Sequence, residues 1–143
     1  MGNDLITGVM TRLRDTFGED TTVYFDEVKQ ELNEPCFFVR TLEISQELVV
    51  RNRYRRVYHL DIEYHPEDRQ QTAREIADVA NTMLMAMEYI YIGENLTRGT
   101  NIRYEVQDKV LHFFITFDFF VIRAKDRGTK MEKLYQRYGL KEV

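Results

Sequence analysis

The clearest pattern in the sequence is an alternation of hydrophobic and polar residues between positions 53 and 65. Even positions carry mostly aromatic and aliphatic side chains, whereas odd positions carry mostly charged ones. Because successive side chains of a β-strand point to opposite faces, the alternation predicts one long, half-buried strand. Its polar face would consist of His59, Asp61, Glu63 and His65. Four arginines crowd its start: Arg51, Arg53, Arg55 and Arg56.

Two other segments place their hydrophobic residues at the spacing of an amphipathic helix. Residues 4–17 do so, and Gly18 is a suitable C-terminal stop. Residues 68–90 repeat the spacing, with Asp68 as the N-cap and Gln71 as its reciprocal partner. The methionines near the end of this second helix are expected to fill the core, because their flexible side chains adapt to irregular gaps.

Two further strands are predicted ahead of the long one. Residues 22–28 and 36–44 are rich in β-branched and aromatic side chains, which favour strands. Residues 45–52 would then be a connection into the long strand, and positions 48–50 make it unusually hydrophobic for a solvated loop. Exposed hydrophobic residues in such a loop indicate a contact surface.

A hairpin is predicted around a two-residue turn at Asp108-Lys109. This register pairs hydrophobic with hydrophobic and polar with polar residues, and a shift by one position would destroy the match. The second arm, residues 110–122, is hydrophobic on much of both faces and is expected to be a central strand. The predicted pairs are Val106 with Leu111, Tyr104 with Phe113, Ile102 with Ile115, Glu105 with His112, and Asn101 with Thr116.

The last element predicted is a short C-terminal helix within residues 129–143. Thr129 and Glu132 form a capping box at its start, and the helix would dock either on its own domain or on a neighbouring subunit. The fold class expected is α+β, a five-stranded, mainly antiparallel sheet packed by two amphipathic helices, plus this short helix. Without a linker or an internal repeat, residues 1–143 are expected to form a single domain.

Composition narrows the classes of function. A net charge of −4 argues against the whole chain being a nucleic-acid binder. Cys36 is the only cysteine, so it forms no intrachain disulfide and no cysteine-based zinc site, and it is expected to be a buried, inert thiol. Neither a signal peptide nor a membrane-spanning run is present, so we expect a soluble protein made in a cytoplasm.

The alternating histidines and carboxylates raise two chemical alternatives. A metal site would need a second strand, since alternate residues of one strand lie about 7 Å apart. His112 and Glu105 could supply ligands only if the two strands were neighbours. A metal-dependent nuclease could use Asp61 and Glu63, but no lysine follows the second carboxylate to stabilise developing charge. A solvated or subunit-facing polar strand is the default interpretation, with no enzymatic activity, bound metal or cofactor.

The arginine cluster also has two interpretations. Arginines clamp phosphates, and they equally pair with carboxylates across protein interfaces. The acidic balance of the chain favours the second, so we assign the cluster and the hydrophobic connection before it to a subunit or partner interface. The residues of this predicted interface are Gln46, Glu47, Leu48, Val49, Val50, Arg51, Arg53, Arg55 and Arg56.

Six short motifs carry a resemblance to a known family, in order and at matching spacing. They are EPCFFV (34–39), SQEL (45–48), NRYRR (52–56), LTRGT (96–100), IRYE (102–105) and VLHFF (110–114). Together, over roughly residues 5–123, they resemble the tail terminator (tail completion) proteins of Gram-positive phages and PBSX-like prophages. A head–tail joining (neck) protein of similar fold is the alternative that the resemblance leaves open.

The resemblance implies an α+β subunit that forms a ring, usually a hexamer, on the last ring of the tail tube. The ring would stop tube growth and present the attachment surface for the head connector, at the head-proximal end of the virion tail. The implied partners are copies of the chain itself, the tail tube protein and the head–tail connector, with the sheath protein as a further candidate. DNA would pass through the lumen as cargo, assembly would take place in the host cytoplasm, and no catalytic residues carry over.

Overall fold

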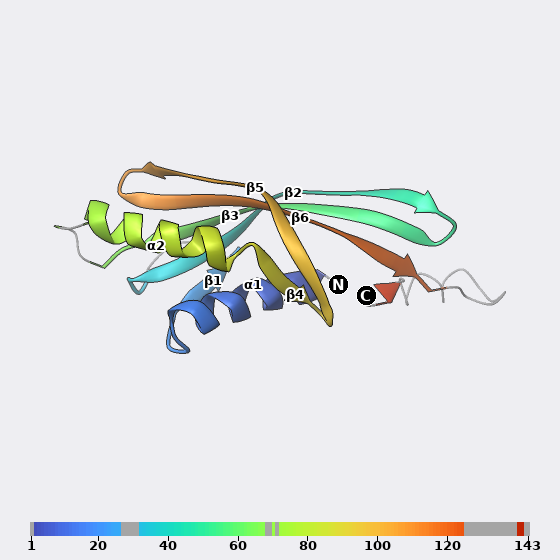
Figure 1. Ribbon diagram of the computed structural model, residues 1–143, viewed down its shortest axis with the longest axis horizontal. Coiled ribbons are helices and arrows are strands. Elements are labelled where there is room, and N and C mark those ends of the chain that lie inside the picture. The colour runs from blue at the N-terminus through green and yellow to red at the C-terminus, as the bar shows by residue number, and fades with distance from the viewer. Residues whose placement is uncertain (1, 27–31, 68–69, 71, 125–139, 142–143) are drawn as a thin grey trace.

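The computed structural model describes residues 2–26, 32–67, 70, 72–124 and 140–141. These residues form two helices and a curved sheet (Figure 1). The helices are α1 (Gly2–Phe17) and α2 (Thr72–Ala86). The strands are β1 (Val23–Phe25), β2 (Cys36–Val50), β3 (Arg53–His65), β4 (Tyr89–Ile92), β5 (Asn95–Gln107), β6 (Val110–Arg123) and β7 (Leu140–Lys141).

The sheet runs in the order β1-β2-β3-β6-β5-β4, and the two-residue strand β7 pairs with β6 beside this path. Only the β1–β2 pairing is parallel among the described strands. The α+β class is therefore confirmed, while the predicted count of five strands is too low. The single-domain assignment stays a prediction.

Both helices lie on one face of the sheet and cover about half of its length (Figure 1). The even positions of β3 point toward the helices, and Leu60 and Ile62 are buried there opposite Ile115 and Phe113 of β6. β6 lies between β3 and β5, which confirms the predicted central strand. The core cluster also takes Leu5, Val9 and Leu13 from α1, Ile76, Ala80 and Met83 from α2, and Met87 from the turn after α2.

The helix α1 packs unusually close to the edge strand β4. A Cβ atom placed on Gly8 would lie 2.1 Å from the backbone oxygen of Tyr91, so only glycine fits at this crossing. The helix ends where the sequence predicts: Gly18 adopts a φ of 119° and donates its N–H to the carbonyl of Arg14.

The prediction that residues 45–52 form a connecting loop is wrong. β2 continues to Val50, and only Arg51 and Asn52 form the turn into β3. The pairs Gln46 with Arg56 and Leu48 with Tyr54 continue the ladder, so the backbone is hydrogen-bonded to the end of the hairpin. We call residues 42–56 the hairpin arm; it extends beyond the part of the sheet that the helices cover (Figure 1).

Two other boundaries differ from the predictions. The second helix ends at Ala86 instead of continuing to residue 90, because the chain turns into the unpredicted strand β4. That strand pairs with the start of β5 after a turn at Gly93, whose φ is 65°. The first predicted strand, residues 22–28, is seen as Val23–Phe25, and the capping residues Asp68 and Gln71 lie outside the described residues.

The predicted hairpin turn at Asp108-Lys109 is confirmed, and both residues have the positive φ that a tight hairpin requires. Three of the predicted pairs are present: Val106 with Leu111, Tyr104 with Phe113, and Glu105 with His112. Of the two pairs farther from the turn, that of Asn101 with Thr116 is wrong, while Ile102 lies in the irregular part of the ladder between Thr100 and Arg103. A bulge after Thr100 shifts the register, so Thr100 and not Asn101 faces Thr116.

Most of the predicted C-terminal helix, including its capping box, lies outside the described residues. Where the chain is described again, Leu140–Lys141 form a strand and not a helix, paired with Ile122 and Arg123 of β6. Cys36 is buried, as expected. Among the described residues, no helix is both long and hydrophobic enough to cross a membrane.

Candidate functional site

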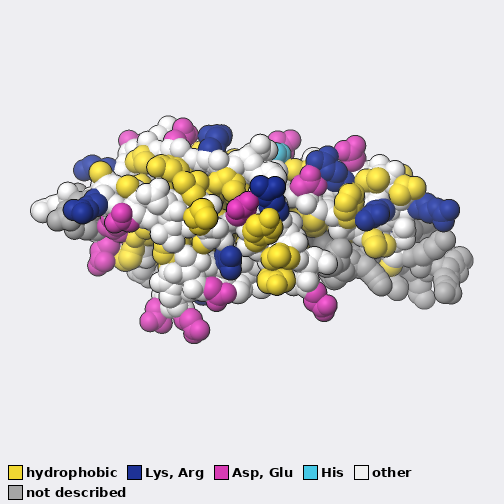
Figure 2. Space-filling model, in the orientation of Figure 1, with side chains coloured by type: hydrophobic (Ala, Val, Ile, Leu, Met, Phe, Trp, Pro, Cys, Tyr) yellow, Lys and Arg dark blue, Asp and Glu magenta, His cyan; other side chains and the backbone are white. Residues whose placement is uncertain are grey.

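The hairpin arm carries all nine residues of the predicted interface, and every residue from Leu42 to Arg53 is exposed. Leu48, Val49 and Val50 expose 50–56% of their surface, although they are hydrophobic. Figure 2 shows hydrophobic and basic side chains side by side at the arm, toward the right of the view. The arm thus presents a hydrophobic surface beside positive charge.

The arginines of the arm have different partners. Arg55 donates to both carboxylate oxygens of Asp118 on β6 and lies 3.7 Å from Glu47, so its charge is balanced within the chain. Arg56 donates to the side-chain oxygen of Gln46. Arg53 places its guanidinium 4.4 Å from the centre of the Phe120 ring, and Arg51 lies in the exposed turn.

Asp118 was not among the predicted site residues. It is the only acidic residue of the hydrophobic stretch 110–122, and that isolation is the signal that could have identified it. A lone carboxylate in a hydrophobic strand indicates a basic partner on the neighbouring strand. β3 pairs with β6 so that Val57 faces Asp118, and Arg55 reaches the carboxylate from the same face of the sheet.

The outer edge of β2 is open along the arm. β1 pairs only with Phe37, Phe38 and Val39, and the described residues place no strand against β2 beyond that point. Just past β1, the backbone N–H of Thr41 is satisfied by Asp26 at 3.1 Å. An open edge of this length offers unpaired backbone groups to another chain.

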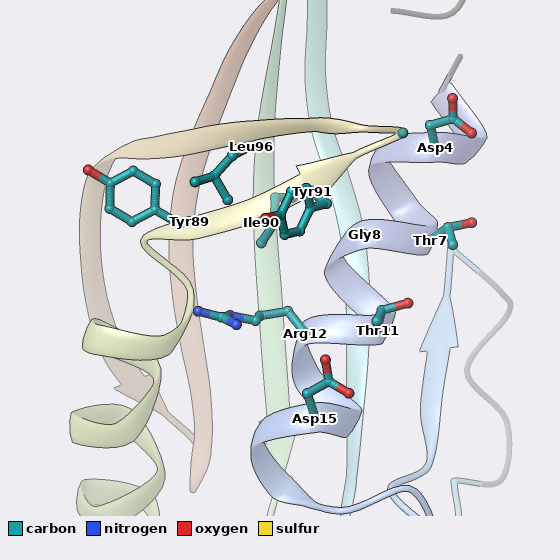
Figure 3. A pocket seen from close by; sticks show the side chains of 11 residues that line it. Asp4, Thr7, Gly8, Thr11, Arg12, Asp15, Tyr89, Ile90, Tyr91 and Leu96 are labelled. Atoms are coloured by element: carbon teal, nitrogen blue, oxygen red, sulfur yellow. The ribbon is translucent and has the colours of Figure 1, made fainter.

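A groove of about 360 Å³ lies between α1 and β4 (Figure 3). Its hydrophobic side is formed by Tyr89, Tyr91 and Leu96, which are 42%, 60% and 58% exposed. Its other side is the exposed face of α1, where Asp4 and Asp15 bring two carboxylates to the rim. The groove was not predicted, because it depends on the unpredicted strand β4.

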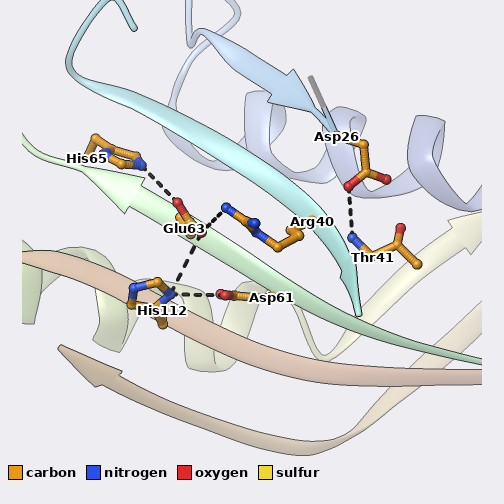
Figure 4. A network of polar contacts seen from close by, with 7 residues as sticks. All are labelled: Asp26, Arg40, Thr41, Asp61, Glu63, His65 and His112. Atoms are coloured by element: carbon orange, nitrogen blue, oxygen red, sulfur yellow. Dashed lines mark hydrogen bonds and ion pairs between the residues drawn. The ribbon is translucent and has the colours of Figure 1, made fainter. Parts of the chain in front are cut away.

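The polar face of β3 is buried within the chain at its C-terminal end. The expectation of a solvated or subunit-facing polar strand is therefore wrong for this end. Asp61, Glu63 and His65 are only 6%, 2% and 8% exposed. They form a network with Arg40 of β2 and His112 of β6 (Figure 4). His59 lies apart from it, with its Nδ1 2.9 Å from the hydroxyl of Thr116.

Glu63 is the centre of this polar cluster. Arg40 donates to its Oε2 at 3.0 Å, His65 Nε2 lies 3.0 Å from its Oε1, and His112 faces it across the β3–β6 pairing. His112 Nδ1 lies 3.0 Å from Asp61 Oδ2. Burial raises the pKa of Asp61, and the contact with His112 acts in the opposite direction.

The geometry meets one condition for a metal site, because the strands carrying His112 and the β3 carboxylates are neighbours. Asp61, Glu63 and His112 can each offer one ligand atom within 4.8 Å of the others. The Arg40 guanidinium, however, already binds the Glu63 oxygen that would face a cation, and its positive charge opposes one there. The cluster fits a buried charge network better than a metal centre.

Comparisons with known proteins give one informative match. The comparison with curated proteins gave none. Among the solved structures that match, one has a TM-score of 0.42 and 13% sequence identity, over 89% of this chain and 99% of that one, which is too weak a likeness to indicate a function. The family described as "Phage tail terminator protein" matches residues 4–129, which is most of the chain. This chain therefore belongs to the family of phage tail terminator proteins.

Proposed function

We propose that copies of this chain close into a ring that caps the tail tube, ends tube polymerisation and presents the attachment surface for the head connector. Membership of the family already gives the chain a structural role in tail assembly, as a component of the virion tail that interacts with other tail or head proteins. The ring, its hexameric copy number and the cap are the parts proposed.

The observation that carries the proposal is the hairpin arm. It projects from the part of the sheet that the helices cover and exposes Leu48, Val49 and Val50 together. Exposed hydrophobic residues gathered on an extended hairpin are a liability for a monomer but suit a subunit whose neighbour covers them. A ring needs such a surface, since each of its subunits contacts two neighbours through different patches.

The proposed partners follow from the position of the cap. One side of the ring would contact the tail tube protein and the other the head–tail connector, with the sheath protein as a further candidate. DNA would cross the lumen without being bound, which the net charge of −4 favours because like charges repel. Assembly would take place in the host cytoplasm, and the proposed role requires no catalysis.

Light scattering and electron microscopy of the purified chain test this function. At high protein concentration, rings are expected in the absence of any partner, and in the presence of tail tube protein they should sit at tube ends. The conclusion depends on both observations. A chain that stays monomeric at high concentration and also leaves tube ends bare would contradict the proposal.

A further inference from the structure

The hairpin arm and the α1–β4 groove have complementary chemistry. The arm exposes Leu48, Val49 and Val50, and the groove exposes Tyr89, Tyr91 and Leu96. Each surface therefore leaves hydrophobic side chains in water that the other could cover, and burial of such area drives association.

The net charges of the two surfaces have opposite signs. The four arginines of the arm outnumber its carboxylates Glu43 and Glu47 together with Asp118, and the two carboxylates of the groove outnumber Arg12. On the arm, Arg55 is balanced by Asp118, which leaves Arg51, Arg53 and Arg56 as the basic side chains near the tip. On the groove, the Arg12 side chain donates to the carbonyl of Ala86 and so points toward the end of α2, while Asp4 and Asp15 line the rim. Complementary potentials of this kind set the register of a protein contact.

The groove is already formed in the free chain. Gly8 lets α1 approach the Tyr91 backbone closely, and Arg12 ties α1 to the end of α2 with a bond of 2.6 Å. The arm is also rigid, because its two strands are paired along their length. Two preformed surfaces lose little conformational freedom when they meet.

The arm does not fill the groove of its own chain. The arm belongs to β2 and β3, the groove to α1 and β4, and in the sheet order β6 and β5 separate β3 from β4. The arm also points away from α1 (Figure 1). A second copy of the chain is the occupant that offers the matching surface.

We propose that the hairpin arm of one copy docks in the α1–β4 groove of the next, and this rests on the proposed ring. Arm and groove are different surfaces of one chain, so the contact is head-to-tail and repeats until the assembly closes. Every arm and every groove is then used, as a closed ring requires.

A charge exchange between the two surfaces tests this contact. The arm variant carries Arg51→Glu and Arg56→Glu, and the groove variant carries Thr11→Lys and Asp15→Lys on the exposed side of α1. Asp4 is kept, because a carboxylate in the first turn of a helix favours it. Each variant alone brings like charges together, so its self-association should be weaker by about tenfold or more.

The equimolar mixture of the two variants is the decisive sample. In an alternating ring, each altered arm meets an altered groove of opposite charge, and each unchanged arm meets an unchanged groove. Assembly should therefore return to the level of the unaltered chain, as measured by sedimentation velocity and electron microscopy. Matched controls are Arg74→Glu and Asp78→Lys, which reverse exposed charges on α2 and should assemble normally.

Three outcomes would overturn the contact. Either variant alone could assemble as well as the unaltered chain, or the mixture could fail to recover. The groove variant could also form rings yet leave tubes uncapped, which would assign the groove to the tube protein. A failure of the unaltered chain to assemble is a different result, because it contradicts the proposed ring itself.

Discussion

Glu63 keeps its carboxylate almost entirely out of water and meets basic side chains from two other strands. Arg40 and His112 approach it from β2 and β6, and His65 approaches it along β3. Taking a charge out of water costs several kcal/mol unless a partner compensates it, so a Glu63 carboxylate without these partners would oppose the pairing of the three strands. The cluster thus ties together the central strands of the sheet.

Asp61 gives this network a testable pH dependence. Burial raises its pKa above the ordinary value of 3.8. When the pKa of a group is higher in the folded than in the unfolded chain, its protonated form stabilises the fold. This stabilisation is complete below the pKa of the unfolded chain and is lost as the pH rises through the pKa of the folded chain. Asp61→Asn cannot ionise, so it should be as stable as the unaltered chain or more stable at about pH 7, with the difference shrinking toward about pH 4.

Urea unfolding across that pH range measures the effect. Asp78→Asn, at an exposed position of α2, is the matched control and should show no such trend. A loss of stability in Asp61→Asn that grows toward neutral pH would mean that the ionised carboxylate stabilises the fold through His112.

At the scale of elements, the crossing of α1 and β4 depends on one missing side chain. An ideal Cβ on Gly8 would lie 2.1 Å from the Tyr91 oxygen, which is backbone and cannot rotate away. Alanine would favour the helix by about 1 kcal/mol, but overpacking costs about 1–3 kcal/mol. Because the clash is with a backbone atom, the cost of overpacking lies toward the upper end of this range, and we expect Gly8→Ala to lower the free energy of unfolding by about 2 kcal/mol.

Urea or thermal unfolding checks this value, with Thr7→Ala on the exposed side of the same helix as the control. If Gly8→Ala raises stability while Thr7→Ala does not change it, the close packing of α1 on β4 is wrong. In the sequence, a glycine inside a helix indicates only a weaker helix, and the reason for Gly8 lies on a different element, β4.

The hairpin arm is the second element that a mutation can isolate. Replacing Leu48, Val49 and Val50 with serine should lower the stability of the monomer by no more than about 1.5 kcal/mol, about 0.5 kcal/mol per substitution, because these side chains are half exposed. Ring formation should weaken strongly, since the same residues supply the hydrophobic surface of the proposed contact. Circular dichroism and light scattering measure the two effects.

Val106→Ser, on an exposed hydrophobic residue of β5, controls for the loss of a strand-forming side chain. An unfolded triple variant would place residues 48–50 in the core of the monomer, and a folded variant that still forms rings would remove them from the contact.

The elements that sequence predicts well are those whose pattern is local. β3 and the β5–β6 hairpin were predicted because alternation and turn chemistry repeat within a few residues. β4 was missed because Met87 and Ile90 continue the helical spacing of α2 into the strand. The extension of β2 cannot be predicted from its own residues, which lack an alternating pattern, because only pairing with β3 makes them a strand.

The candidate sites follow the same rule. The exposure of residues 48–51 could be expected from the sequence, since hydrophobic and basic residues lie together there. Their role in an interface stays a prediction. The partner of each arginine could not be predicted, because Arg55 is balanced by Asp118, which is 63 residues away along the chain. The burial of Glu63 depends in turn on Arg40 and His112 from two other strands.

At the scale of the whole molecule, the two helices and the arm divide the chain into a covered half and an open half. The covered half holds the core, and the open half exposes the arm and the free edge of β2. A monomer would expose both the arm and the free edge of β2, and an assembly would cover them. This division is the physical reason to expect that the chain works as one subunit among several.

Tail tube growth provides the test at this scale, and it separates a terminator from a head–tail joining protein. Light scattering measures tube elongation. Because a cap needs only one ring per tube, elongation should stop when the chain is added in amounts equivalent to the number of tube ends. The triple serine variant of the arm should have to be added in large excess to do the same, because fewer rings form. If the unaltered chain slows growth only when it matches the concentration of free tube protein, it acts by binding subunits and not by capping. If it leaves growth unchanged but binds finished tubes, the joining role becomes the better assignment.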